Sequence, residues 1–167
     1  MREGQVKTEY LGTAVVDSSS ATSLVTLDHV SAGYSATPLA AKIGVKEGHR
    51  VTLLGAPRDW TLEGLPAKVR LVRRRGSSSQ DVDVAFFRDA ASLGRAIADL
   101  SRSITPDGSL WIAWPRRAGG HRSDITDHVV RGAALTLGLV DVKVAALDDD
   151  WSALKLVWRK ERRANLR

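Results

Sequence analysis

Apolar residues fall along the chain in short runs with two different spacings. Nearly continuous apolar runs at Arg50–Pro57 and Ser109–Trp114 predict strands that are buried on both faces, as in parallel sheets. Lys68–Arg73 alternates apolar and charged residues, which is typical of a half-exposed edge strand. Three further runs predict strands at Asp81–Phe87, Asp141–Leu147 and Ser152–Trp158.

Helical spacing appears between these strands. Thr37–Gly44 predicts a short helix, and Asp89–Ile104 predicts a longer one with apolar residues three or four positions apart. A third helix is expected after residue 122, capped by Ser123 or Asp124 and ended by Gly138. Its expected buried face is Ile125, Val129, Ala133 and Leu137.

The order of these elements predicts an α/β fold. Strands that alternate with helices favour a compact Rossmann-like, mostly parallel sheet of about six strands with helices on its faces. The short link Asp148–Trp151 suits a hairpin, so the last strand is expected to run antiparallel. We expect one domain over residues 31–160, followed by a charged tail at 161–167. The polar residues 1–30 predict a flexible extension, and Val30 suggests the hypothesis of a mis-called start.

Composition narrows the class of protein. The chain of 167 residues has no cysteine, which favours a reducing cytoplasm, and it has no stretch of roughly 18 apolar residues, the length that a membrane span needs. Its net charge is +6, with −2 on residues 1–30 and +8 on the remainder. That balance can attract phosphorylated ligands, acidic partners or nucleic acid, and it is equally consistent with simple solubility. The sequence does not indicate an oligomeric state.

The most informative stretch for function is the strand Ser109–Trp114 and the glycine-rich basic loop after it. Ligands of open α/β sheets bind beyond the carboxyl ends of the strands. Four segments should converge there: Gly55–Trp60, Arg88–Asp89, Pro115–Ser123 and Asp148–Trp151. The alternative is a surface loop whose glycines serve only to turn the chain. As a binding site, the loop would hold an anion with guanidinium groups and free amides: Arg116, Arg117, Gly119, Gly120, Arg122 and Ser123.

A second group of residues is expected to line the same edge or to lie beside it. It comprises Gly55, Arg88, Asp89, Trp114, Lys143, Asp149 and Trp151. We interpret Asp148-Asp149-Asp150 as a solvated hairpin tip, because its spacing differs from that of a calcium loop. His121 and His128 lack a third ligand, so no metal site is predicted.

Motifs of common enzyme classes are missing from the sequence. No G-x-G-x-x-G follows the strand Arg50–Pro57, and no P-loop, nucleophile elbow or H-E-x-x-H is present. No catalytic residue and no cofactor is therefore assigned. A helix-turn-helix over Thr126–Ala146 is disfavoured, because Val140, Val142 and Val144 alternate with polar residues as in a strand.

An ordered string of short motifs runs from Gly33 to about Lys160: Gly33-Tyr34-Ser35, Thr37-Pro38-Leu39, Gly55-Ala56-Pro57, Trp114-Pro115-Arg116-Arg117, Gly138-Leu139-Val140-Asp141 and Trp151-Ser152. With this string the chain resembles a family of small bacterial proteins known as domain of unknown function 3052. Its C-terminal portion also resembles that half of class I methyltransferases, where a Pro-Asp-Gly turn such as Pro106-Asp107-Gly108 leads into a strand. The resemblance implies a fold and a site location, and no activity.

Three functional hypotheses remain open at this point. The first is a non-catalytic cytoplasmic protein that binds an anionic metabolite or nucleotide at residues 115–123. The second, from the methyltransferase resemblance, is a divergent adenosylmethionine-dependent transferase with Gly55 near the cofactor and Asp89 on its ribose or base. The third is a basic adaptor for nucleic acid or protein.

Overall fold

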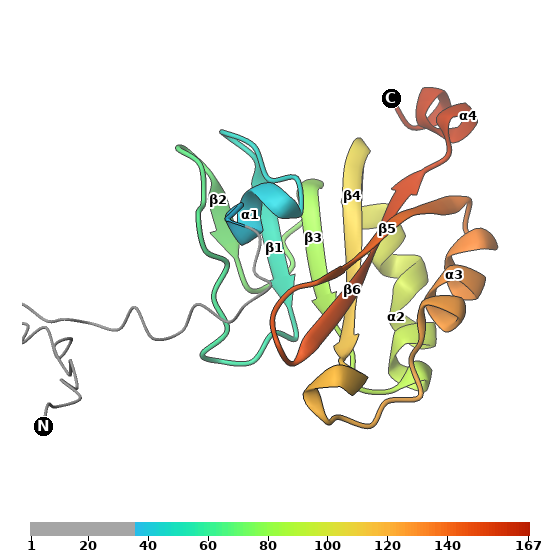
Figure 1. The fold of residues 1–167 in the computed structure, drawn as a ribbon. Helices are drawn as coiled ribbons and strands as arrows, with labels where there is room; N and C mark the ends of the chain where they lie inside the picture. Colours follow the sequence, from blue (N-terminus) through green and yellow to red (C-terminus); the bar gives the residue numbers. More distant parts are fainter. Residues whose placement is uncertain (1–35) are drawn as a thin grey trace, which may run out of the picture. The chain divides into compact units, whose positions relative to one another are not determined.

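The centre of the structure is one mixed sheet of six strands in the order β2-β1-β3-β4-β6-β5 (Figure 1). The computed structural model describes residues 36–167. Its strands are β1 Arg50–Leu54, β2 Arg70–Val72, β3 Gln80–Phe86, β4 Ile104–Pro115, β5 Leu139–Ala146 and β6 Trp151–Trp158. Its helical segments are α1 Leu39–Lys42, α2 Ala90–Ser103, η1 Arg117–Gly119, α3 Asp127–Leu135, α4 Lys160–Arg163 and η2 Ala164–Leu166.

Strand β6 runs against the direction of its neighbours. β1 pairs in parallel with β2 and β3, and β3 pairs in parallel with β4. β6 is antiparallel to both β4 and β5, because the chain between Ala146 and Trp151 is too short for a crossover and must close a hairpin. The predicted fold class, an α/β protein with a mostly parallel sheet and an antiparallel last strand, is confirmed.

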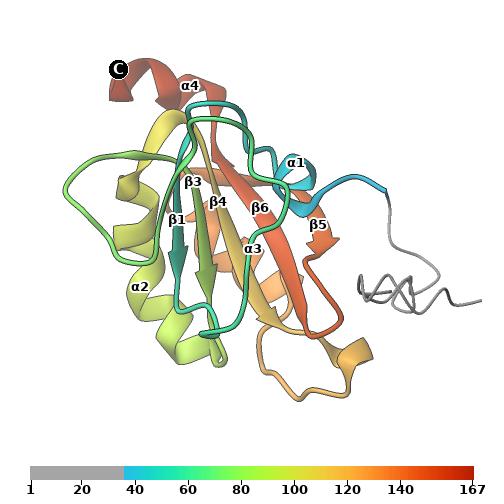
Figure 2. The ribbon, with the colours of Figure 1, turned by 90° about the vertical axis from the view of Figure 1, so that its left-hand side faces the viewer.

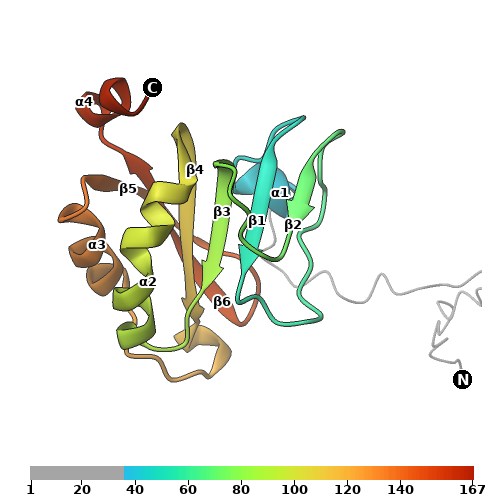
Figure 3. The same ribbon diagram turned by 180° about the vertical axis from the view of Figure 1, so that it is seen from behind.

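The continuous apolar runs are explained by burial on both faces of the sheet. Along β4, Trp111 and Ala113 point into one cluster of buried side chains, and Leu110 and Ile112 point into the other. Helices α2 and α3 cover the second face (Figure 3), and α1 packs on the first (Figure 2). The indole of Trp111 donates to the Ile43 carbonyl at 3.0 Å, which joins the short α1 segment to the centre of the sheet.

The third helix begins later than the sequence predicted. Thr126 caps α3 by accepting from the Val129 amide at 3.3 Å, and the buried positions are Val130 and Ala134. Val129, expected inside, is 37% exposed. The reason is that Ser123 and Asp124 accept from other amides, so the chain stays non-helical up to Thr126 and the helical face shifts by one residue.

The charged tail folds back as α4 and η2. Arg163 Nε donates to the Trp158 carbonyl at 3.0 Å, and Arg167 pairs with Asp107 at 2.8 Å. Residues 36–167 form one compact unit, while the extension and the hypothesis of a mis-called start concern residues 1–30, outside the described part of the chain. Between residues 36 and 167, no helix is long and apolar enough to cross a bilayer.

Candidate functional site

The four predicted segments meet at the carboxyl edge of the parallel strands, at the bottom of Figure 1. The loop after β1 and the tip of the β5–β6 hairpin are joined by a hydrogen bond from Trp60 Nε1 to Asp148 Oδ2 at 2.6 Å. The loop after β4 is joined to the same tip by a bond from the Arg116 amide to the Asp150 carbonyl at 2.7 Å. Segments more than 30 residues apart in sequence therefore form one continuous surface, which we name the carboxyl edge.

The loop from Arg116 to Ser123 is held against the hairpin tip. His121 Nε2 lies 2.7 Å from Asp150 Oδ1. Gly119 packs on the hairpin backbone so closely that a Cβ there would lie 2.4 Å from the Asp149 carbonyl oxygen. Gly120 adopts a left-handed φ of 80°, a conformation that glycine adopts without strain. The two glycines thus position the loop as well as turn it.

Asp148 organises the hairpin tip. Its Oδ1 accepts from the amides of Asp150 and Trp151 at 2.8 and 2.7 Å, and its Oδ2 accepts from Trp60. The expectation of a solvated tip is wrong for this half-buried residue, because its carboxylate satisfies donors from two segments. A local signal was available, since aspartate commonly accepts from backbone amides two or three residues further on in turns.

Three aromatic rings pack together at this edge. The ring centroids of Trp60 and Phe86 are 4.9 Å apart, those of Phe86 and Trp151 are also 4.9 Å apart, and both contacts are edge-to-face. The Arg88 guanidinium lies 5.1 Å from the centroid of Trp151. These three rings pack over the carboxyl ends of β1 and β3 and the start of β6, and the Arg88 guanidinium lies at the margin of the aromatic cluster.

The cations at the edge differ in how they are held. Half-buried Arg116 donates through Nη1 to the Asp148 carbonyl at 3.4 Å. Arg117 and Arg122 are exposed. In the described part of the chain, no carboxylate pairs with either of them or with Arg88. The guanidinium groups of Arg88, Arg117 and Arg122 are therefore available to a ligand.

Two carboxylates at the edge support helix α2 instead of facing a ligand. Asp89 caps the helix by accepting from the amide of Ser92 at 2.7 Å and from its hydroxyl at 2.9 Å. These hydrogen bonds, chiefly the one from the amide, hold the pKa of Asp89 below its usual value. Asp124 Oδ1 accepts from the Ala90 amide at 2.9 Å. The amides at the start of α2 are thus already partly occupied by protein oxygens.

The structure does not gather every residue of the candidate set. Gly55, Arg88, Asp89, Asp149 and Trp151 lie at the carboxyl edge with the 116–123 loop. Two others do not face this surface: Trp114 lies at the carboxyl end of β4 but packs its side chain into the cluster beneath α2 and α3, and Lys143 donates to the Lys42 carbonyl beside α1 at 2.9 Å.

Ser123 also differs from its expected role. Its hydroxyl accepts from the Ile125 amide at 3.1 Å, so it is not at the first turn of α3 and offers no helix amides to an anion. Among residues 36–167, no three potential metal-ligating side chains lie together, and His121 contacts Asp150 rather than His128.

Comparisons with known proteins identify a family and a similar fold, and they do not identify a function. Residues 67–160 match the family described as "Protein of unknown function (DUF3052)". A search of curated proteins found no match. A SAM-dependent methyltransferase from Aquifex aeolicus is similar in structure, with a TM-score of 0.52 and 13% identity over 71% of this chain and 86% of that one. A TehB-like SAM-dependent methyltransferase from Corynebacterium glutamicum gives a TM-score of 0.48 and 11% identity, over 76% and 90% of the two chains.

Proposed function

The chain belongs to the DUF3052 family and has a methyltransferase-like fold, and we propose that it is a cytoplasmic, non-catalytic protein that binds a small anionic ligand at the carboxyl edge. One observation carries the proposal: Arg88, Arg117 and Arg122 lie at this edge with no carboxylate partner in residues 36–167. The ligand class is a phosphorylated metabolite or a nucleotide.

The geometry suits such a ligand for two reasons. A guanidinium group offers planar paired donors that match phosphate oxygens, and its charge strengthens each bond. The loop that carries Arg117 is already fastened to the hairpin by Gly119 and His121, so less conformational freedom is lost on binding. The proposal assigns no reaction, because Asp89, Asp124 and Asp148 each accept hydrogen bonds from backbone amides that hold the fold together.

Thermal unfolding with added ADP tests the proposal. We expect ADP to raise the Tm of the wild-type protein, since a ligand at a hundredfold over its Kd stabilises by about 2.7 kcal/mol. Arg88→Gln and Arg117→Gln should each weaken ADP binding about tenfold, as the loss of a charged hydrogen bond implies. Arg74→Gln is the control, because Arg74 is exposed on another loop and no partner contacts it in the described chain.

Two outcomes would overturn the proposal: no stabilisation by millimolar ADP, or equal binding by wild type, Arg88→Gln and Arg117→Gln. The binding of duplex DNA to the wild-type protein is measured at several salt concentrations in parallel. Salt-sensitive DNA binding without any effect of ADP would favour a basic adaptor instead.

The similarity in fold to a SAM-dependent methyltransferase favours one second candidate, a divergent adenosylmethionine-dependent transferase. The residues at the end of β1 do not fit the cofactor of that class. Pro57, two residues after Gly55, lacks an amide donor, and the β1–β2 connection contains no helix. Trp60 packs there against Phe86, and the carboxylate of Asp89 caps α2. A rise in Tm with adenosylmethionine, lost in Asp89→Asn but not in Arg117→Gln, would support the transferase.

A further inference from the structure

A pocket lies at the opposite end of the sheet from the carboxyl edge. Its volume is about 310 Å³, and it opens between the α1–β1 connection, the start of β3, the 105–109 segment of β4 and strand β6. Its charged and hydroxyl-bearing lining residues include Lys46, His49, Asp81, Asp107, Ser109 and Lys155. We name it the amino-edge pocket.

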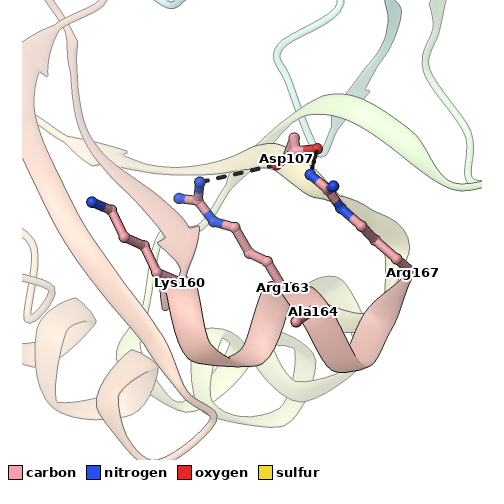
Figure 4. A pocket seen from close by; sticks show the side chains of 5 residues that line it. All are labelled: Asp107, Lys160, Arg163, Ala164 and Arg167. Atoms are coloured by element: carbon pink, nitrogen blue, oxygen red, sulfur yellow. Dashed lines mark hydrogen bonds and ion pairs between the residues drawn. The ribbon is translucent and has the colours of Figure 1, made fainter.

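Both carboxylates of the amino-edge pocket are already paired with arginines. Asp81 Oδ2 accepts from the Arg50 amide at 2.8 Å and lies 3.7 Å from Arg50 Nε. Asp107 Oδ2 lies 2.8 Å from Arg167, and its Oδ1 lies 4.0 Å from Arg163, so two of the three arginines of the 161–167 tail reach this one aspartate. Figure 4 shows these pairs in a neighbouring pocket, which both arginines line. The negative charge in the lining of the amino-edge pocket is therefore balanced by Arg50, Arg163 and Arg167, none of which lines the amino-edge pocket itself.

The lysines of the pocket have no such partner. In the described residues, no carboxylate or carbonyl accepts from the amine of Lys155 or Lys46. Lys155 is half-buried, with its amine 5.9 Å from the ring centroid of Trp111. Burial, with repulsion from Lys143 and Lys46, lowers the pKa of Lys155. Lys155 is therefore a partly buried charge without an anionic partner, and Lys46 adds a second, exposed amine to the same pocket.

Neutral donors complete the lining. His49 Nδ1 accepts from the Lys46 amide at 3.2 Å, so the neutral ring carries its hydrogen on Nε2 as a donor. The hydroxyls of Thr105 and Ser109 make no hydrogen bond with another described residue, and Ser109 is buried. Two amines, an imidazole and two hydroxyls thus surround one space.

We propose that the amino-edge pocket binds a phosphate monoester, with its dianionic phosphate group between Lys46 and Lys155. His49 and Ser109 donate to the same phosphate oxygens, because both line the pocket beside these lysines. The pocket volume falls in the lower range of small-molecule sites and exceeds the space that a phosphate ion needs, so it also admits a small organic group. This site is separate from the carboxyl edge, and neither proposal depends on the other.

Inorganic phosphate is the probe for the test, compared with chloride at equal ionic strength. We expect phosphate to raise the Tm of the wild-type protein. Lys155→Met keeps an unbranched side chain over Trp111 but removes the charge, so it should raise the Tm of the free protein and weaken phosphate binding at least tenfold in titration calorimetry. Lys46→Gln, at an exposed position, should weaken binding similarly without affecting folding.

Two controls separate this site from general charge effects and from the carboxyl edge. Arg74→Gln, which removes one exposed positive charge away from both sites, should bind phosphate as the wild type does. Arg117→Gln removes a charge from the carboxyl edge, so a change in its phosphate binding reports phosphate held at that edge and not in the pocket. The proposal is overturned if 50 mM phosphate stabilises the wild type no more than chloride does. It is also overturned if Lys46→Gln and Lys155→Met both keep the wild-type affinity for phosphate, or if Arg74→Gln weakens phosphate binding as much as these two substitutions do. Loss of phosphate binding in Arg117→Gln alone would likewise reject the pocket and place the phosphate at the carboxyl edge.

Discussion

At the scale of single residues, Asp83 stands out because it is a fully buried carboxyl in the middle of the sheet. Ser103 Oγ donates to its Oδ2 at 2.5 Å, while Oδ1 and the hydroxyl of its strand neighbour Thr52 have no partner. Burial is the main reason that the pKa of Asp83 is raised above 3.8. The folded state therefore binds this proton more tightly than the unfolded state, and stability falls as the pH rises from 3.8 through the folded-state pKa.

Asp83→Asn should stabilise the protein at neutral pH. The amide carries no charge to desolvate, and its NH₂ group can donate toward Thr52, so we expect a gain of about 1–2 kcal/mol at pH 7. The gain should shrink as the pH falls through the folded-state pKa toward 3.8, where the wild-type carboxyl is also neutral. Urea unfolding at several pH values measures this, with the exposed Asp59→Asn as control. A gain of equal size at every pH would contradict the explanation.

At the scale of elements, replacing either of two glycines by alanine is expected to change the stability of the protein, but in opposite directions. Gly119→Ala places a Cβ 2.4 Å from the Asp149 carbonyl oxygen, so the 116–123 loop must move off the hairpin; we expect a loss of about 1–3 kcal/mol. Gly94 lies inside α2 with nothing within 4 Å of an added Cβ, so Gly94→Ala should stabilise by about 0.5–1 kcal/mol. Thermal or urea unfolding compares both variants with wild type. A neutral Gly119→Ala would show that the loop is not held by this contact.

Local sequence patterns predict some of these elements and contacts and miss others. Apolar spacing and turn residues predict α2, most of each strand and the segments that meet at the carboxyl edge. Strand β4 begins earlier than predicted, at Ile104, so Pro106-Asp107-Gly108 lies inside the strand and not in a turn before it. The start of α3 does not follow from such patterns, because Ser123, Asp124 and Thr126 are all good caps and only the position of the Ala90 amide decides among them. The contact between Trp60 and Asp148 joins residues 88 positions apart, so no local pattern could indicate it. The contact of Lys143 with the Lys42 carbonyl likewise joins residues 101 positions apart, so no local pattern could indicate it.

At the scale of the whole described unit, one sheet contributes to both apolar clusters, so the two faces should unfold together. Alternate residues of β3 and β4 enter each cluster, and neither face can lose these strands alone. Tryptophan reports on each face separately, since Trp60, Trp111 and Trp151 lie in one cluster and Trp114 and Trp158 in the other.

We expect a single unfolding transition for both faces. In a variant with Trp114→Phe and Trp158→Phe, fluorescence reports on the face that carries α1; with Trp60→Phe, Trp111→Phe and Trp151→Phe, it reports on the face beneath α2 and α3. For each variant, the urea midpoint by fluorescence should equal its own midpoint by far-ultraviolet circular dichroism. The comparison within one variant removes the effect of the substitutions on stability. Separate midpoints in either variant would mean that one layer of helices and loops unfolds while the sheet persists.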